Sequence, residues 1–132
     1  MQDTLPRPDL DQLRALARQS AAITQDCNCR SVDSSGWISL PLSLPETQLA
    51  DIATLIVDPY DEPTFTEYHP DGTRYASPEA PIAPAWYPYN RCNIARCQQC
   101  GRHLLRYMEA GGYFVDRRIR ALDRPELVVD AA

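Results

Sequence analysis

Five cysteines lie in two groups that are far apart in the sequence, and their spacing is the feature that most constrains the fold. Three of them fall within "RCNIARCQQCGRH", which runs from Arg91 to His103, and the other two fall within "DCNCR", from Asp26 to Arg30. Closely spaced cysteine pairs are typical of metal sites, because four thiolates hold a zinc ion in a tetrahedron at about 2.3 Å. A shared ion would join the two groups and close a loop of about 70 residues.

We expect the ligands to be the cysteines of the two closest pairs: Cys27, Cys29, Cys97 and Cys100. Two residues separate Cys97 from Cys100, a spacing that lets both sulfurs face one ion, and Gly101 then permits the tight backbone. Only one residue separates the cysteines of the first pair. Cys92 is surplus, and it either replaces Cys29 or packs in the core. His103 is a further alternative ligand.

Two other roles for the cysteines remain open. Disulfides need an oxidising compartment, and an odd number of cysteines would leave one thiol unpaired. Isolated buried thiols are also common, because cysteine is a small apolar residue. The N-terminus "MQDTLPRPDLDQLRA" has no basic segment followed by an apolar one, as a secretory signal would, and no run approaches the ~18 apolar residues of a membrane span. We therefore expect a cytoplasmic protein without a membrane partner, and favour the metal site.

The knuckle "CQQCG", followed by a predicted β-hairpin, resembles the knuckle-and-hairpin half of a zinc ribbon. The resemblance covers about residues 92–120 and implies a structural Zn²⁺ bound by cysteines. It implies no single activity, because metal-stabilised folds serve many functions. The sequence departs from the zinc-ribbon pattern at "CNC", where two intervening residues would be expected. Four thiolates leave no open coordination position, so the zinc is expected to be structural rather than catalytic.

The hydrophobic pattern of the first half predicts a helix and short strands within one domain, residues 1–132. Leu10, Leu13 and Ala17 repeat at helical spacing after a capping Asp9, so a helix is expected from about Asp9 to Ala22. "GWISLPLSL" reads as a short strand whose prolines restrict it to an edge. "PETQLADIATLIV" fits either a short helix that begins at its proline or a strand.

Two β-hairpins are expected further along the chain. "TFTEYH" and "TRYAS" flank the turn residues "PDG" over residues 64–77, and "HLLRYM" and "YFVDRRI" flank "EAGG" over residues 103–119. Between them, residues 78–88 hold four prolines together with Trp and Tyr, which indicates an extended segment packed on the core. The predicted fold class is α+β: an N-terminal helix, two β-hairpins and a zinc-ribbon-like four-cysteine site.

The charge of the chain is unevenly distributed. Its net charge is −5, and all 13 basic residues are arginine, which we attribute to a GC-rich bacterial coding bias. Residues 31–90 carry a balance of −8 and residues 91–132 a balance of +3. An acidic centre beside a basic end suits self-association or a basic partner. The acidic side chains gather in one stretch that can also attract a hard cation: Asp58, Asp61, Glu62, Glu67, His69 and Asp71.

No motif of metalloproteases, serine hydrolases or phosphate-binding loops occurs, so we expect a non-enzymatic protein. A Cys–His dyad of Cys92 with His69 or His103 stays an open alternative. The predicted function is that of a protein-interaction module, either an accessory or regulatory subunit or an immunity-type inhibitor of a basic protein. The alternative is nucleic-acid binding through an arginine-rich hairpin with interleaved aromatics: Arg102, Arg106, Arg117, Arg118, Arg120, Tyr107, Tyr113 and Phe114.

Overall fold

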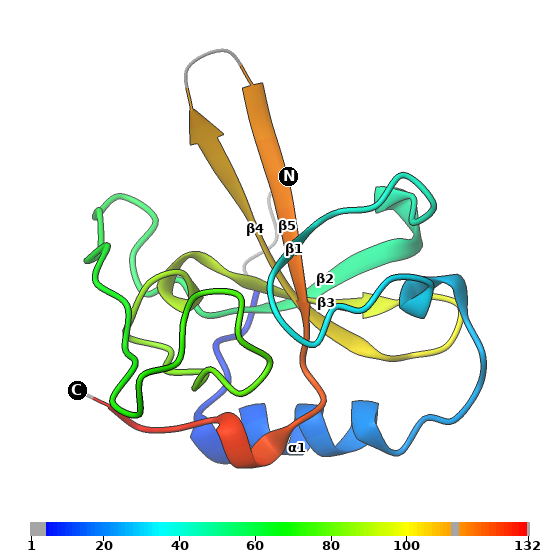
Figure 1. The fold of residues 1–132 in the computed structure, drawn as a ribbon, viewed down its shortest axis with the longest axis horizontal. Coiled ribbons are helices and arrows are strands. Elements are labelled where there is room, and N and C mark those ends of the chain that lie inside the picture. Colours follow the sequence, from blue (N-terminus) through cyan, green and yellow to red (C-terminus); the bar gives the residue numbers. More distant parts are fainter. Residues whose placement is uncertain (1–4, 112–113, 132) are drawn as a thin grey trace.

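The protein was analysed as a computed structural model that describes residues 5–111 and 114–131. Within these residues, one α-helix lies along a face of a five-stranded antiparallel sheet with the strand order β1-β5-β4-β3-β2 (Figure 1). The helix is N-terminal, and the α+β class predicted from the sequence is confirmed. No helix in the described part of the chain is both long and apolar enough to cross a membrane.

The regular elements are α1 (Leu10–Ala21), β1 (Ile38–Ser39), β2 (Leu49–Thr54), β3 (Asn93–Cys97), β4 (His103–Gly111) and β5 (Phe114–Ala121). Short 3₁₀ helices are η1 (Asn28–Arg30), η2 (Glu46–Gln48), η3 (Tyr89–Arg91) and η4 (Pro125–Leu127). The segment "PETQLADIATLIV", whose sequence fitted either a helix or a strand, contains both, because η2 follows Pro45 and leads directly into β2.

The helix begins where its sequence signal placed it. The Asp9 side chain accepts a hydrogen bond from the Gln12 backbone at 2.8 Å, and the Gln12 side chain accepts one from the Asp9 backbone at 2.9 Å. This reciprocal capping box satisfies amide donors that the first turn would otherwise leave unpaired. Leu13 and Ala17 then face the sheet and are buried. The amphipathic pattern therefore attaches α1 to one face of the sheet.

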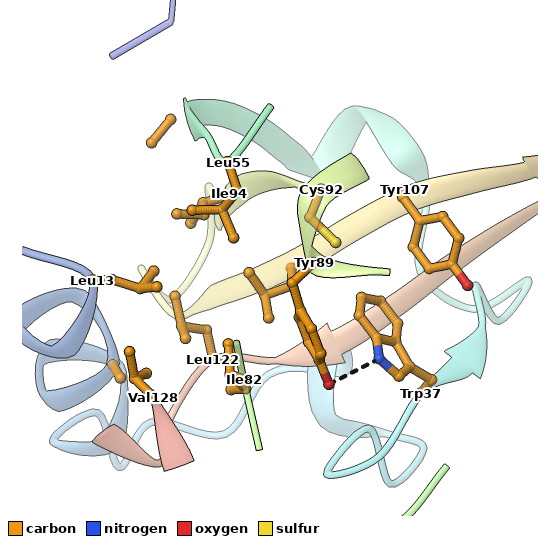
Figure 2. Packing of buried hydrophobic residues seen from close by; sticks show 13 residues of the cluster. Leu13, Trp37, Leu55, Ile82, Tyr89, Cys92, Ile94, Tyr107, Leu122 and Val128 are labelled. Atoms are coloured by element: carbon orange, nitrogen blue, oxygen red, sulfur yellow. Dashed lines mark hydrogen bonds between the residues drawn. The ribbon is translucent and has the colours of Figure 1, made fainter. Parts of the chain in front are cut away.

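The core between α1 and the sheet gathers apolar side chains from distant parts of the chain (Figure 2). Leu13 from α1 and Val128 from the C-terminal segment meet Ile94 and Leu105 from the central strands. At the other end, the Trp37 indole N–H donates to the Tyr89 hydroxyl at 3.3 Å. The proline-rich segment contributes the buried Ile82, whose backbone pairs with the C-terminal segment, so this segment packs on the core as expected.

The second predicted hairpin is confirmed as β4–β5, with Leu104 opposite Ala121 at its base and Gly111 opposite Phe114 near its tip. Beyond Arg106, β4 no longer pairs with β3, so the outer part of the hairpin extends past the other strands (Figure 1). The tip, residues 112–113, lies outside the described residues, as does the side chain of Phe114. Tyr113, named above among the interleaved aromatics, is one of these.

The first predicted hairpin, residues 64–77, is wrong, because no strand forms there. The expected turn exists: Gly72 has φ +80° and its N–H donates to the His69 carbonyl. The flanking backbone, however, bonds to the proline-rich segment instead of to itself. The carbonyl of Thr66 accepts from the Tyr87 N–H, and the carbonyl of Thr64 accepts from the Asn90 side chain. Tertiary hydrogen bonds have replaced the local ladder that the alternating pattern suggested.

Candidate metal centre

Four cysteines from two distant parts of the chain meet beside the sheet. The Sγ atoms of Cys27, Cys29, Cys97 and Cys100 all lie within 4.8 Å of one another. Cys27 and Cys97 sulfurs are 3.7 Å apart, and Cys29 and Cys100 sulfurs are 3.5 Å apart. Four sulfurs about 2.3 Å from a central zinc would be separated by about 3.8 Å. The tetrad therefore has the dimensions of a tetrahedral thiolate site, and all five cysteines are free thiols.

The second pair lies on a tight turn between β3 and β4. Gly101 has φ +89°, a conformation that side chains other than glycine rarely adopt, and its N–H donates to the Cys97 carbonyl at 2.8 Å. The Cys97 N–H in turn donates to the Arg102 carbonyl at 2.8 Å. This geometry directs the amides of Gln99 and Cys100 toward the Cys97 sulfur. The knuckle expected from "CQQCG" is thus present.

The first pair lies at the 3₁₀ turn η1, which follows α1: Cys27 caps the turn and Cys29 lies within it. The N–H of Arg30 donates to the Cys27 carbonyl at 3.0 Å, so the chain folds back between the two cysteines. Cys29 is buried, whereas Cys27 lies nearer the surface. A single intervening residue is enough here because the 3₁₀ turn brings both sulfurs to the same side. The departure from the two-residue spacing is therefore compatible with a four-sulfur cluster.

Two amide side chains form a bridge over the cluster. Gln48 donates to the Cys97 sulfur at 3.3 Å and to the Cys27 sulfur at 3.6 Å. The Asn28 and Gln48 amides also bond to each other, with N–O distances of 2.7 and 3.1 Å. The Gln48 N–H groups stabilise negative charge on sulfur and orient two ligands from different parts of the chain, and Asn28 holds the Gln48 amide in place.

The electrostatics of the cluster favour partial ionisation. Burial raises the pKa of Cys97, but hydrogen bonds from Gln48 and from the Cys100 and Gln99 amides outweigh it and lower the pKa to about 6. Burial, together with neighbouring thiols, raises the pKa of Cys27 and Cys29. Arg102 donates to the Cys100 sulfur at 3.4 Å and to the Ile23 carbonyl at 2.9 Å. Four thiols held this closely can ionise together only around a cation, which is the chemistry of a metal site.

Cys92 and His103 lie away from the tetrad. Cys92 is fully buried just before β3, and its thiol donates to the Pro88 carbonyl at 3.2 Å. Burial raises the pKa of this thiol. The Nδ1 atom of His103 is 2.8 Å from the Leu16 carbonyl oxygen, so the ring connects β4 to α1. His69 instead contacts Glu67 and Thr73. Neither histidine is hydrogen-bonded to Cys92 among the described residues.

The carboxylates of the acidic stretch are spread along an irregular surface loop. Among the described residues, three or more potential metal-ligating groups converge at the cysteine tetrad, and no carboxylates converge in this way. Three of the acidic side chains, those of Asp58, Asp61 and Glu62, line a shared surface cavity of about 350 Å³. They lie next to two strongly exposed side chains, Val57 and Tyr60, which are 74% and 95% exposed.

The arginines of the hairpin are largely engaged within the protein. Arg102 and Arg120 are buried, at 6% and 1% exposure. Arg106 pairs with Asp51 at 2.8 Å, Arg117 with Glu46 at 2.8 Å, and Arg118 with Asp116 at 2.9 Å. The sequence did not reveal these partners. Asp51 lies on β2, Glu46 lies on η2, and Asp116 is two positions before Arg118 on β5.

No protein-family model, curated protein or solved structure matches the chain.

Proposed function

We propose that the cysteine tetrad binds a structural Zn²⁺ and that the protein acts by binding another protein. Tetrahedral dimensions, sulfur ligands alone and N–H donors around them support zinc over hard cations, which prefer oxygen. The ion would link the end of α1 to the β3–β4 knuckle across 70 residues of sequence. Zinc binding of about 10–16 kcal/mol in small peptides is comparable to the ~5–15 kcal/mol stability of a whole domain. Folding would then depend on the metal.

Metal content and X-ray absorption test this part of the proposal. Purified protein should contain one zinc per chain, with four sulfur neighbours at about 2.3 Å in the absorption spectrum. Chelation should lower the melting temperature strongly. Protein that holds no metal and yet retains full stability after chelator treatment would refute the zinc proposal.

The observation that carries the binding function is the exposed loop from Val57 to Glu62. It presents an apolar and an aromatic side chain, Val57 and Tyr60, among three carboxylates. Exposed aromatic side chains act as anchors in protein interfaces, while surrounding charges increase the association rate. This combination fits a partner with a basic surface, as an accessory subunit or an immunity-type inhibitor would require.

The test compares variants of the loop with matched variants elsewhere. The wild-type protein serves as bait to isolate its partner from the source cell. The association and dissociation rates of the purified pair are then measured by surface plasmon resonance. Tyr60→Ala should speed dissociation, whereas Leu42→Ala, at a side chain equally exposed on another loop, should not. Asp61→Lys with Glu62→Lys should slow association, whereas Glu79→Lys with Asp130→Lys, both exposed, should change it less. A partner that binds all four variants like wild type docks elsewhere, and the proposed interface would be abandoned.

A further inference from the structure

A cavity adjoins the exposed loop from Val57 to Glu62. It has a volume of about 350 Å³, and residues of the stretches 56–63 and 84–90 line it. A hydrogen bond between these two parts of the chain helps to fix its shape, since the Asn90 Nδ2 group donates to the Thr64 carbonyl at 2.9 Å. The cavity is therefore part of the folded chain rather than a surface that a partner has to create.

Apolar residues form most of the walls of this cavity. They are Ile56, Val57, Pro63, Pro84 and Ala85. A cavity of this size lies at the lower end of the ~300–1,000 Å³ range of small-molecule sites, which are mostly apolar with a few polar groups. Such walls suit an aliphatic chain, and the polar groups among them decide what that chain carries at its end.

Three carboxylates line the same cavity, those of Asp58, Asp61 and Glu62. Within the described part of the chain, none of the three forms an ion pair. Three of the lining residues are thus acidic and none is basic. The cavity carries negative charge that the described residues do not neutralise, so it is complementary to a cation.

Two arginines donate to this loop without neutralising its carboxylates. Arg7 donates to the Val57 carbonyl at 3.5 Å, and Arg91 donates to the Pro63 carbonyl at 2.8 Å. The Arg91 guanidinium also lies over the Phe65 ring, 4.0 Å from its centroid. Neither arginine lines the cavity. Both are engaged elsewhere, and the place for a cation in the cavity is left to a ligand.

A buried acceptor at this cavity lacks a hydrogen-bond donor. Asn90 lines the cavity and is 5% exposed. Its Nδ2 group donates to the carbonyls of Thr64 and Ala85, at 2.9 and 3.4 Å, which fixes the orientation of the amide. The Oδ1 atom of Asn90 is buried and has no partner among the described residues. Because an unpaired buried acceptor is unfavourable, a ligand that brings an N–H group to this atom gains stability.

The arrangement of the acceptors favours one kind of cation. Among the described residues, the potential ligand groups that converge as those of a metal ion do are the four cysteines, and the carboxylates of the loop are not among them. A guanidinium spreads five N–H donors over a planar fork and is weakly hydrated, so it can serve separated acceptors between apolar walls. An ammonium group concentrates the same charge on one strongly hydrated atom. The cavity therefore fits an arginine side chain better than lysine or a metal ion.

We propose that this cavity receives an arginine side chain of the partner. The aliphatic stem packs against Val57 and Pro84, and the guanidinium donates to the carboxylates of Asp61 and Glu62 and to the Asn90 Oδ1 atom. A guanidinium edge can pair with both oxygens of a carboxylate, which gives direction as well as affinity. Because this arginine belongs to the partner that docks on the exposed loop, the assignment rests on the proposed function.

The probe is Nα-acetylarginine methylamide, used with the purified full chain and followed by amide NMR shifts. It should give saturable shifts concentrated on residues 56–63 and 84–90. The citrulline analogue has the same length without the charge and should bind about tenfold more weakly. The lysine analogue should also bind more weakly than the arginine probe. Ca²⁺ should displace the arginine probe no more than NaCl of equal ionic strength does, because both then only screen the charges.

Variants of the lining separate the cavity from a general attraction to negative charge. Asp61→Asn and Glu62→Gln should each weaken binding of the arginine probe about two- to fivefold. Asp71→Asn is the matched control, because Asp71 is exposed in the same acidic stretch and does not line the cavity. Ala85→Leu keeps the charge and fills part of the cavity, so it should also weaken the probe. Ala21→Leu, at an exposed position of α1, should not.

The arginine site is overturned if the shifts map outside the cavity, or if the citrulline or lysine analogue binds as tightly as the arginine probe. It is also overturned if Ala85→Leu binds the probe like wild type. Failure of the proposed function gives a different result: the probe binds in the cavity, but the isolated partner ignores the loop variants. Partner binding that depends on Tyr60, without any binding of the arginine probe, would keep the loop as the interface and refute the arginine site alone.

Discussion

The side-chain amide of Gln48 donates a hydrogen bond to the Cys97 sulfur at 3.3 Å, although 49 positions separate the two residues. The sheet creates this contact, because Leu49, the next residue, is the register partner of Cys97 in the β2–β3 pair. The amide also contacts the Cys27 sulfur and the Asn28 side chain. Gln48 therefore connects both halves of the candidate metal centre without being a ligand.

Gln48→Leu is predicted to weaken metal binding while the fold persists. Loss of a hydrogen bond to a metal ligand typically reduces affinity by about 10- to 100-fold. Competition with a chromogenic chelator measures this change. Gln99→Leu is the matched control, because Gln99 is exposed and its side chain approaches the Cys27 sulfur only to 3.9 Å. Equal effects of both substitutions would show that the Gln48 contact is unimportant for the metal.

Serine substitutions are predicted to separate the ligands from the surplus cysteine. Cys97→Ser or Cys100→Ser should remove the metal and unfold most of the protein, because a hydroxyl is a poor zinc ligand. Cys92→Ser should keep one metal per chain and cost about 1–3 kcal/mol of stability, since the smaller polar side chain lies in an apolar site. Metal analysis and thermal unfolding of each variant provide the measurements. Metal loss in Cys92→Ser would mean that Cys92 belongs to the ligand set.

Arg120→Leu is predicted to destabilise the fold severely. Arg120 is 1% exposed, and its guanidinium donates to the carbonyls of Ser35, Pro78 and Ala80 and to the Tyr89 hydroxyl. Removing these donors leaves several buried acceptors unpaired, at a cost of about 3 kcal/mol or more. Arg74→Leu, at an exposed position, should change stability by less than about 0.5 kcal/mol. Urea unfolding of the two variants tests the difference.

Nucleic-acid binding through the hairpin is predicted to be absent. The described arginines of this hairpin are buried or paired with carboxylates, which leaves little uncompensated positive charge for phosphates. Fluorescence anisotropy with DNA and RNA at about 50 mM salt should show no binding, at a salt level where counterion release would favour it. Affinity that falls steeply with added salt, and that Arg117→Ala with Arg118→Ala weakens, would instead support the nucleic-acid alternative.

Local features of this protein could be read from the sequence because they depend on neighbouring residues. Asp9 and Gln12 cap α1 within one helical turn. Gly101 completes the knuckle one position after Cys100, and the β4–β5 hairpin follows its alternating pattern. The four cysteines could also be named in advance, because two close pairs and one surplus thiol leave few ways to assemble a tetrahedral set.

Tertiary structure decided the features whose partners lie far apart in the sequence. Residues 64–77 have the alternation and turn of a hairpin, yet Tyr87 and Asn90 take the hydrogen bonds that a ladder would need. In the sequence Arg120 is one of several similar hairpin arginines. In the folded protein it is buried, and its guanidinium donates to backbone carbonyls of two distant segments. Hydrogen-bond competition and burial are properties of the folded chain, and no short stretch of sequence carries them.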